Sequence, residues 1–350
     1  MRFSWMLLMG VISSGVASPQ QAGFSGPVEG FIFDSPTASL RPVAGIPGAA
    51  TFGRALVEGL EFASAAPQRN YAVAFQSGNP LLVTGLSLDP SSVSTAPIAA
   101  LSRVPERIAW TSDGSFAVLY SRAAGWIQTL SGLPGNPVAS GYISIAALGG
   151  SLSAVAVDSK QQVAIAVTGP GAGVYLLTGG QSFAPVLQLA NPVALAFSSD
   201  GTQLFAIDSA SGNLAILDLA SFGSHTMLLQ GITDPFAVSS GPGGKVYIAG
   251  RNDHVLQEYD LGSGQPLAQV PLYFAPTQIE QFGANSFLLA PRVQPADPLW
   301  LATSGAQPLP YFVPAIPQTI GRSRLARQNL APVGASSDTR GTEEGHRHAR

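Results

Sequence analysis

Residues that could carry out acid–base or metal chemistry are scarce in this chain. It holds four histidines and no cysteine, and His346 and His348 lie near the C-terminus. The most polar stretch, RNDHVLQEYD, contains His254 and Glu258. In an extended strand, residues four apart face the same side, so these two are the weak candidates for a metal or acid–base site. A catalytic zinc ion normally needs three protein ligands, so we expect a solvated, charge-paired surface on an outer strand here, and no cofactor.

Motifs for nucleophilic or nucleotide chemistry are absent or fall on turns. The sequence has no G-x-S-x-G nucleophile elbow. GPGGKV (241–246) resembles part of a phosphate loop, but no Ser or Thr follows Lys245. GPGAGV (169–174) resembles a fragment of a dinucleotide fingerprint, but it joins two apolar strands and opens no helix. We interpret both as turns.

The composition predicts many short strands. Charged residues make up 11% of the chain, whereas 39 glycines and 28 prolines interrupt it every few residues. Such frequent breakers are unfavourable for long helices. The formal net charge is -3, and the acidic body offers no basic face for the phosphates of a nucleic acid.

A unit of four short strands repeats along the chain. Its clearest copy, PVALAFSSDGTQLFAIDSASGNLAILDL, begins at Pro192 and turns at Asp200-Gly201. Comparable turns occur near residues 69, 113, 158, 200, 243 and 284, at intervals of 41 to 45 residues. This period is typical of β-propeller blades. Strands such as YAVAF and VAIAV are apolar on both faces, as expected where blades pack against each other.

The repeat predicts an all-β protein, a β-propeller of four-stranded antiparallel blades spanning residues 28–317. We favour seven blades, with the hairpin in EGFIFDSPTASLRPVAG (29–45) in the blade that closes the ring. The alternative is six blades, with this hairpin completing the last one. Asp113, Asp158 and Asp200 recur at the blade period and could form a ring of carboxylates, but Asp is a preferred turn residue, and we expect that role.

The 192–219 unit resembles the repeats of the YVTN/lactonase-like group of bacterial propellers. The residues that carry this resemblance are Pro192, Ala196, Asp200, Gly201, Leu204, Phe205, Ala206, Gly212, Leu214, Ile216 and Asp218. The resemblance implies a secreted or periplasmic bacterial propeller. It carries over no catalytic residue.

The two ends of the chain differ from the repeats. MRFSWMLLMGVISSGVA (1–17) has a positive n-region, an apolar h-region and small residues before a cleavage site, which predicts a signal peptide. Residues 18–27 are expected to be a linker. Residues 318–350 are polar and rich in arginine, so we expect a disordered tail. The mature chain should therefore be secreted or periplasmic, with no membrane span.

The sequence favours a binding function over catalysis. We expect a monomeric, non-enzymatic scaffold that binds a protein, peptide or envelope ligand at one end face of the propeller, with no nucleic acid. The alternative is a lactonase-like or metal-assisted hydrolase with its site in the central channel. A third hypothesis is adhesion, with the arginine-rich tail contacting anionic polymers. The polar side chains that face the channel should separate these hypotheses.

Overall fold

The computed structural model describes residues 26–304 and 308–316, which form seven antiparallel β-sheets. The predicted signal peptide and tail lie outside these residues, as does most of the linker. Three short 3-10 helices, Ser35–Thr37, Pro90–Ser92 and Ala146–Leu148, are the only helices in the described part. None of the described helices is long and apolar enough to cross a membrane.

Blade 5 shows how the repeat builds a sheet. Its strands are β18 (Pro192–Phe197), β19 (Gln203–Asp208), β20 (Asn213–Asp218) and β21 (Ser224–Leu228), paired in that order. Five of the six residues of β19 are buried, because neighbouring blades cover both of its faces. The turn between β18 and β19 needs a left-handed residue at its tip, and Gly201 takes it with φ of 64°.

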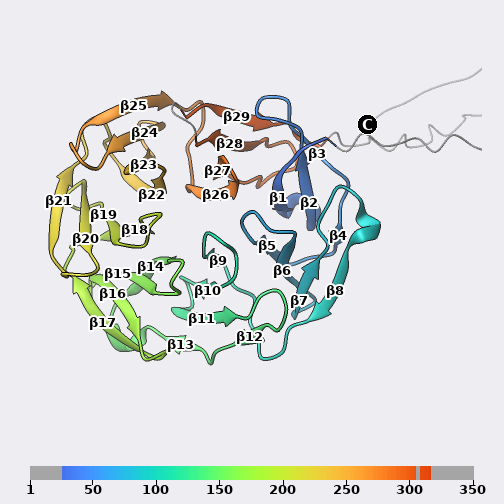
Figure 1. Cartoon of the computed structure of the whole chain (residues 1–350), viewed down its shortest axis with the longest axis horizontal. Coiled ribbons are helices and arrows are strands. Elements are labelled where there is room, and N and C mark those ends of the chain that lie inside the picture. The colour runs from blue at the N-terminus through green and yellow to red at the C-terminus, as the bar shows by residue number, and fades with distance from the viewer. Residues whose placement is uncertain (1–25, 305–307, 317–350) are drawn as a thin grey trace, which may run out of the picture. The chain divides into compact units, whose positions relative to one another are not determined.

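Blades 2 to 4, 6 and 7 repeat this arrangement, with the innermost strand first in the chain (Figure 1). The strands of blades 2 to 4 are β5 Phe62–Ala65, β6 Tyr71–Gln76, β7 Asn79–Thr84, β8 Ser94–Pro97, β9 Arg107–Trp110, β10 Ala117–Ser121, β11 Trp126–Ser131, β12 Val138–Ala139, β13 Ile143–Ser144, β14 Ser151–Val157, β15 Val163–Thr168, β16 Gly173–Thr178 and β17 Ser182–Leu187. Those of blades 6 and 7 are β22 Pro235–Gly241, β23 Lys245–Gly250, β24 Val255–Asp260, β25 Pro266–Pro271, β26 Glu280–Gly283, β27 Ser286–Ala290, β28 Leu299–Thr303 and β29 Pro310–Val313.

Seven blades are present, so the predicted propeller and its favoured blade count are confirmed. All six turns of the repeat join the first strand of a blade to its second strand. The N-terminal hairpin does not complete blade 7. It forms blade 1 together with the segments that follow it: β1 (Val28–Asp34), β2 (Ser39–Ala44), β3 (Thr51–Phe52) and β4 (Val57–Glu58).

Blade 1 differs from the others in having three rows of strands. β1 pairs along the whole of β2, whereas β3 and β4 pair with its two ends, so they share the other edge as one interrupted strand. β12 and β13 divide the outer row of blade 3 in the same way. Blade 3 still has three further rows, and blade 1 has only two.

Because blade 1 has one row fewer than the other blades, β1 runs in the opposite direction to the innermost strands of its neighbours. A Cβ on Gly283, at the end of β26, would meet the backbone oxygen of Glu29 near the start of β1. The last residue of β1, Asp34, contacts Arg292, which follows β27. β1 therefore runs antiparallel to β26, as the second strand does in the other six blades.

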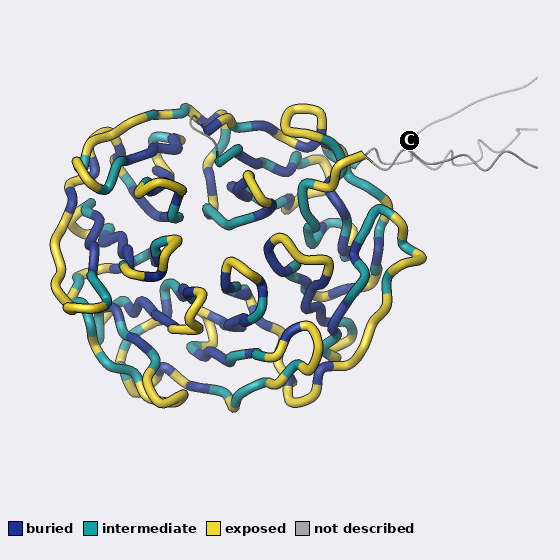
Figure 2. The backbone as a smooth tube through the Cα atoms, in the orientation of Figure 1, coloured by how far each residue is buried: buried dark blue, intermediate teal, exposed yellow. Residues whose placement is uncertain are grey.

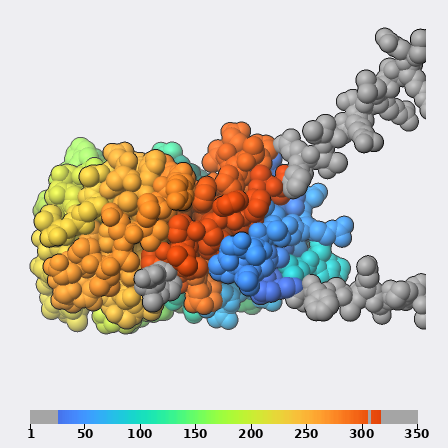
Figure 3. Space-filling view, turned by 90° about the horizontal axis from the view of Figure 1, so that it is seen from above, coloured from blue at the N-terminus to red at the C-terminus, as the bar shows by residue number. Residues whose placement is uncertain are grey.

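The core is divided among the seven junctions between blades. Each neighbouring pair of blades shares one apolar cluster, and the last of these clusters joins blade 7 to blade 1. The second strands are the most deeply buried, whereas long stretches of the outer strands are exposed (Figure 2). In Figure 3 the red residues of blade 7 lie directly beside the blue residues of blade 1. The ring is thus closed by side chains, without a strand shared between the ends of the described chain.

Candidate functional site

The two residues singled out from the sequence lie in different environments. His254 is exposed in the turn before β24, with φ of 51°, and its carbonyl accepts a hydrogen bond from Leu272 N at 2.7 Å. Glu258 lies within β24 with a side chain only 1% exposed, and its Oε1 is 2.9 Å from Lys245 Nζ. The predicted charge pairing is therefore present at Glu258, but the predicted solvation is wrong, because the sheet buries this carboxylate.

The surroundings of Glu258 indicate a structural role. Burial is the main cause that raises the pKa of Tyr247 to about 12, and the negative charge of Glu258 adds to this effect. Across the described ranges 26–304 and 308–316, no group of three or more His, Cys, Asp or Glu side chains could hold a metal ion.

The periodic aspartates belong to their own hairpins, as predicted. Asp200 Oδ1 accepts hydrogen bonds from Ser198 Oγ at 2.6 Å and from Thr202 N at 3.0 Å, which hold the pKa of Asp200 at about 2. Asp113 and Asp158 likewise accept backbone N–H groups two residues further along the chain. We call the end of the ring where these turns lie the hairpin end.

A cavity of about 890 Å³ lies along the axis of the ring and is lined by the innermost strands of blades 2 to 7 and by β1 of blade 1. Much of its wall is made of small side chains, namely Ala63, Ala65, Ala109, Ala154, Ala194 and Ala237. The two serines in this wall are used between blades: Ser64 Oγ accepts Trp110 Nε1 at 2.8 Å, and Ser153 Oγ donates to Pro192 O at 2.6 Å. This part of the channel offers little chemistry.

Charged side chains gather where the innermost strands begin, opposite the hairpin end. These residues are Glu106, Arg107, Arg122, Arg251 and Glu280, and we call this the charged end of the channel. The strands place them there because Arg107 and Glu280 open β9 and β26, whereas Arg122 and Arg251 lie in turns between second and third strands.

Glu106 is committed to its own blade. Its carboxylate accepts hydrogen bonds from Ser121 Oγ at 2.9 Å and from the backbone N atoms of Arg122 and Ala123, both at 3.0 Å. Arg122 Nε lies 3.8 Å away. Burial opposes ionisation, but these hydrogen bonds and the arginine charge together lower the pKa of Glu106. This carboxylate therefore stays ionised and fastens the turn after β10.

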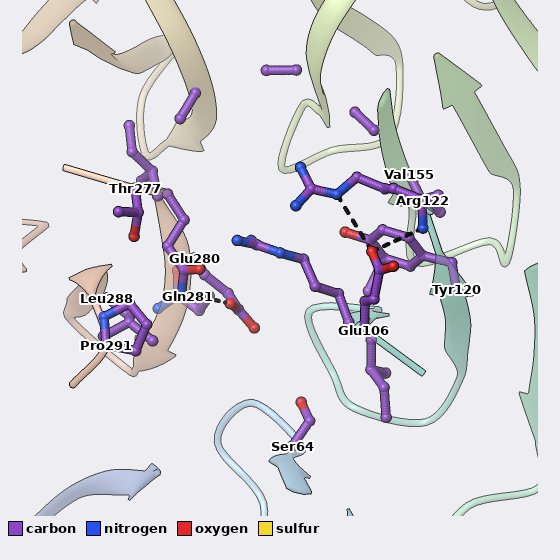
Figure 4. A pocket seen from close by; sticks show the side chains of 18 of the residues that line it. Ser64, Glu106, Tyr120, Arg122, Val155, Thr277, Glu280, Gln281, Leu288 and Pro291 are labelled. Atoms are coloured by element: carbon purple, nitrogen blue, oxygen red, sulfur yellow. Dashed lines mark hydrogen bonds and ion pairs between the residues drawn. The ribbon is translucent and has the colours of Figure 1, made fainter. Parts of the chain in front are cut away.

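The pKa of Glu280 is shifted in the opposite direction to that of Glu106. Burial raises its pKa, and the positive charge of Arg107 counteracts this only in part. Its Oε2 accepts a hydrogen bond from Gln278 Nε2 at 3.0 Å. Figure 4 shows Glu280 and Gln281 on one side of the open space, with Glu106, Tyr120 and Arg122 on the other. A carboxyl group with a raised pKa can exchange a proton closer to neutral pH than an exposed one.

Arg107 is the uncommitted cation of this end. Its guanidinium forms no hydrogen bond or ion pair with any residue in the described part of the chain, although its charge acts on both Glu280 and Tyr120. Burial is the main cause that raises the pKa of Tyr120 to about 12. Arg107 can therefore accept an anionic group beside a proton-exchanging carboxyl.

Motif searches miss these residues because each is a single charge in an apolar strand. In the sequence, only the positions of these residues within the repeat indicate that they face the channel. Arg107 precedes the turn at Asp113 by six residues, and Glu280 precedes the turn at Ala284 by four. In a propeller, those positions fall at the end of the channel away from the turn.

The fold and the site together define a seven-bladed β-propeller with a charged end to its channel. No protein-family model matches the chain, and no curated protein sequence does. A streptogramin B lyase structure is similar with a TM-score of 0.53 and 12% identity, over 77% of this chain and 85% of that one.

Two structures of virginiamycin B lyase from Staphylococcus aureus are also similar. One has a TM-score of 0.51 and 9% identity, over 83% of this chain and 95% of that one. The other is a catalytically inactive form with quinupristin, with a TM-score of 0.52 and 9% identity, over 81% and 94%. At these identities the similarity shows the fold.

Proposed function

We propose that this protein binds a small ligand with an anionic group at the charged end of its channel. The observation that carries the proposal is the guanidinium of Arg107, which points to no partner within the described residues and adjoins a cavity of about 890 Å³. Ligand pockets commonly have volumes of about 300–1,000 Å³ and combine apolar walls with a few polar groups. Arginine is the side chain best suited to carboxylate or phosphate.

The test is a thermal-shift and calorimetric titration with inorganic phosphate, citrate and a panel of aromatic carboxylates. Replacement of Arg107 by Met keeps an unbranched apolar stem and removes the guanidinium with its charge, so binding of the best anion should weaken by at least about tenfold. Arg54→Met is the matched control, because Arg54 is exposed and lies outside the channel lining. Equal affinities of the two variants would overturn the proposal.

A second candidate is an acid–base enzyme in which Glu280 moves a proton on the ligand held by Arg107. The raised pKa of Glu280 favours it, and so does the similarity in fold to streptogramin B lyases. The alternative of an enzymatic channel site thus gains support over a scaffold without catalysis. Quinupristin is the first substrate to test, with its loss followed by liquid chromatography.

The Glu280→Gln variant separates this candidate from simple binding. The wild-type protein should consume quinupristin, and the variant should lose at least about a hundredfold of that rate while still binding anions. If neither protein consumed quinupristin, the hypothesis of a streptogramin lyase would be wrong. The anion-binding proposal would not be affected.

We also propose export of the chain and kinship with the YVTN/lactonase-like group. Export is supported by the composition of residues 1–17, and kinship by the repeat that begins at Pro192. Fractionation of cells that express the chain with and without residues 1–17 tests export. Retention of both forms in the cytoplasm would contradict it.

A further inference from the structure

The inner edge of blade 1 is one strand short. In the other six blades, an innermost strand lies next to the channel and runs antiparallel to the second strand. Blade 1 begins with β1, which runs in the direction of a second strand and pairs only with β2. The backbone groups on its channel side have no strand beside them within residues 26–304 and 308–316. A strand added to this edge would lie about 4.8 Å from β1.

Two cavities meet along this edge. The channel cavity and a second cavity of about 680 Å³ at the hairpin end share Phe31, Ala65 and Phe282 as lining residues. We call the part of this space that lies along β1 the slot. It is flanked by residues 28–33 of β1, residues 62–66 of blade 2 and residues 281–283 of blade 7. The slot thus lies between the innermost strands β5 and β26, where the missing row would be (Figure 1).

We propose that the slot binds an extended segment of a partner polypeptide, about six residues long, as the innermost strand of blade 1. Adding a strand to a free edge gives affinity through main-chain hydrogen bonds. The segment would run antiparallel to β1, because that direction restores the alternation of the other six blades. This site is separate from Arg107 and does not depend on anion binding there.

The lining defines the chemistry of the partner segment. Within the three segments that flank the slot, Glu29, whose Oε2 accepts Tyr311 Oη at 2.7 Å, is the only charged residue. Arg69 and Asp89 lie only at the hairpin end of the second cavity. A charged residue inside it would lose its water without gaining a counter-charge. The strands that fill this row in blades 4 and 5, SLSAVAV and PVALAF, are uncharged as well. The partner segment is therefore uncharged, with small and branched apolar residues.

A peptide that copies residues 151–157, SLSAVAV, with a fluorophore on a polar linker, is the probe. The full chain has no cysteine, so Ala65→Cys introduces a unique thiol in the slot, and Ala96→Cys places a matched thiol on the exposed outer strand β8. Saturating peptide should slow labelling of the first thiol by about tenfold or more and leave the second unchanged. Ala65→Trp, which fills the slot, should abolish binding, whereas Ala96→Trp should not.

N-methylation of the peptide separates strand addition from apolar packing. Alternate backbone N–H groups of a strand point toward the same neighbour. Methyl groups on one alternate set should weaken binding by about tenfold or more, and those on the other set by no more than about twofold. Equal effects of the two sets would overturn strand pairing.

Two further results would overturn the proposal. One is the absence of saturable binding by the probe to the full chain. The other is a thiol in the Ala65→Cys protein that is already protected without peptide while that of Ala96→Cys reacts. That result would mean that the slot is filled in the free protein, by the chain itself or by a second copy. Native mass spectrometry would tell the last two apart.

Discussion

The junction between blades 4 and 5 and the junction between blades 7 and 1 join similar sheets by different means. The first is an apolar cluster in which Leu204, Ala206 and Leu217 are fully buried, crossed by hydrogen bonds from Ser153 Oγ and Lys160 Nζ to backbone carbonyls of blade 5. The second adds links between pairs of polar side chains to its apolar cluster: Arg292 Nη1 contacts Asp34 Oδ1 at 2.8 Å, and Tyr311 Oη donates to Glu29 Oε2 at 2.7 Å. The difference coincides with the blade that lacks a row.

The physical reason lies in what each junction must specify. Blades that follow one another in the chain are placed side by side by their short connections. Blades 7 and 1 are joined across 258 residues between Asp34 and Arg292, so their side chains alone define the register. Directional hydrogen bonds specify a register more sharply than apolar contacts do, and Ser35 Oγ adds one to Arg292 O at 3.0 Å.

The largest effect is expected from breaking the buried ion pair. Arg292→Met would leave the Asp34 carboxylate, whose side chain is 0% exposed, with Arg41 Nε at 3.7 Å as its remaining cation. Removal of one partner of a buried pair costs about 3–5 kcal/mol. The free energy of unfolding from guanidinium titration measures this loss.

The double variant Asp34→Asn, Arg292→Met is the control for this prediction, because it removes both charges. It should regain most of the lost stability. A double variant as unstable as the single one would show that Arg292 acts through its other contacts and not through the ion pair. Those contacts are the Phe52 ring, whose centroid is 5.1 Å from the guanidinium carbon, and the carbonyls of Asp297 and Pro295.

A somewhat smaller effect is expected at the apolar junction. Leu204→Ala removes a side chain with 0% exposure and leaves no polar group unpaired, so its cost is that of lost burial and a cavity, about 2–4 kcal/mol. The same titration, repeated at pH 5 and pH 8, should give the same loss at both. A loss that changes with pH would show that the effect of Leu204→Ala is not one of apolar burial alone.

The repeat was predictable from the sequence because its signals are local. Asp200-Gly201 and its counterparts lie within a few residues of the strands they join, and both-sided apolar strands such as β19 identify the buried second row. The period then gave the blade count. These features need no knowledge of contacts distant in the chain.

Blade 1 and the charged end of the channel were not predictable in the same way. β3 and β4 have two residues each, too few to show a strand pattern, so the three-row sheet could not be recognised. Arg107 and Glu280 come together only when blades 3 and 7 are placed around one axis. His254 and Glu258 were candidates because they are close in sequence. The role of Glu258 depends instead on its burial beside Lys245, which the sequence does not show.

The smallest effect concerns the pH dependence of the polar junction. Burial raises the pKa of Glu29 in the folded protein, and the hydrogen bond from Tyr311 lowers it by less. The folded state therefore binds this proton more tightly than the unfolded state, whose glutamate pKa is about 4.3. Its contribution to stability is complete below that pH and is lost as pH rises through the folded pKa.

Glu29→Gln should remove this loss, because a neutral amide keeps an acceptor for Tyr311 Oη without the charge. The variant should gain stability relative to wild type between pH 4 and pH 7, by less than either substitution above costs. Glu58→Gln, at an exposed position on β4, should give a curve parallel to that of the wild type. If the Glu29→Gln curve is also parallel, then the pKa of Glu29 is not raised in the folded protein, and the pH dependence of the junction has another source.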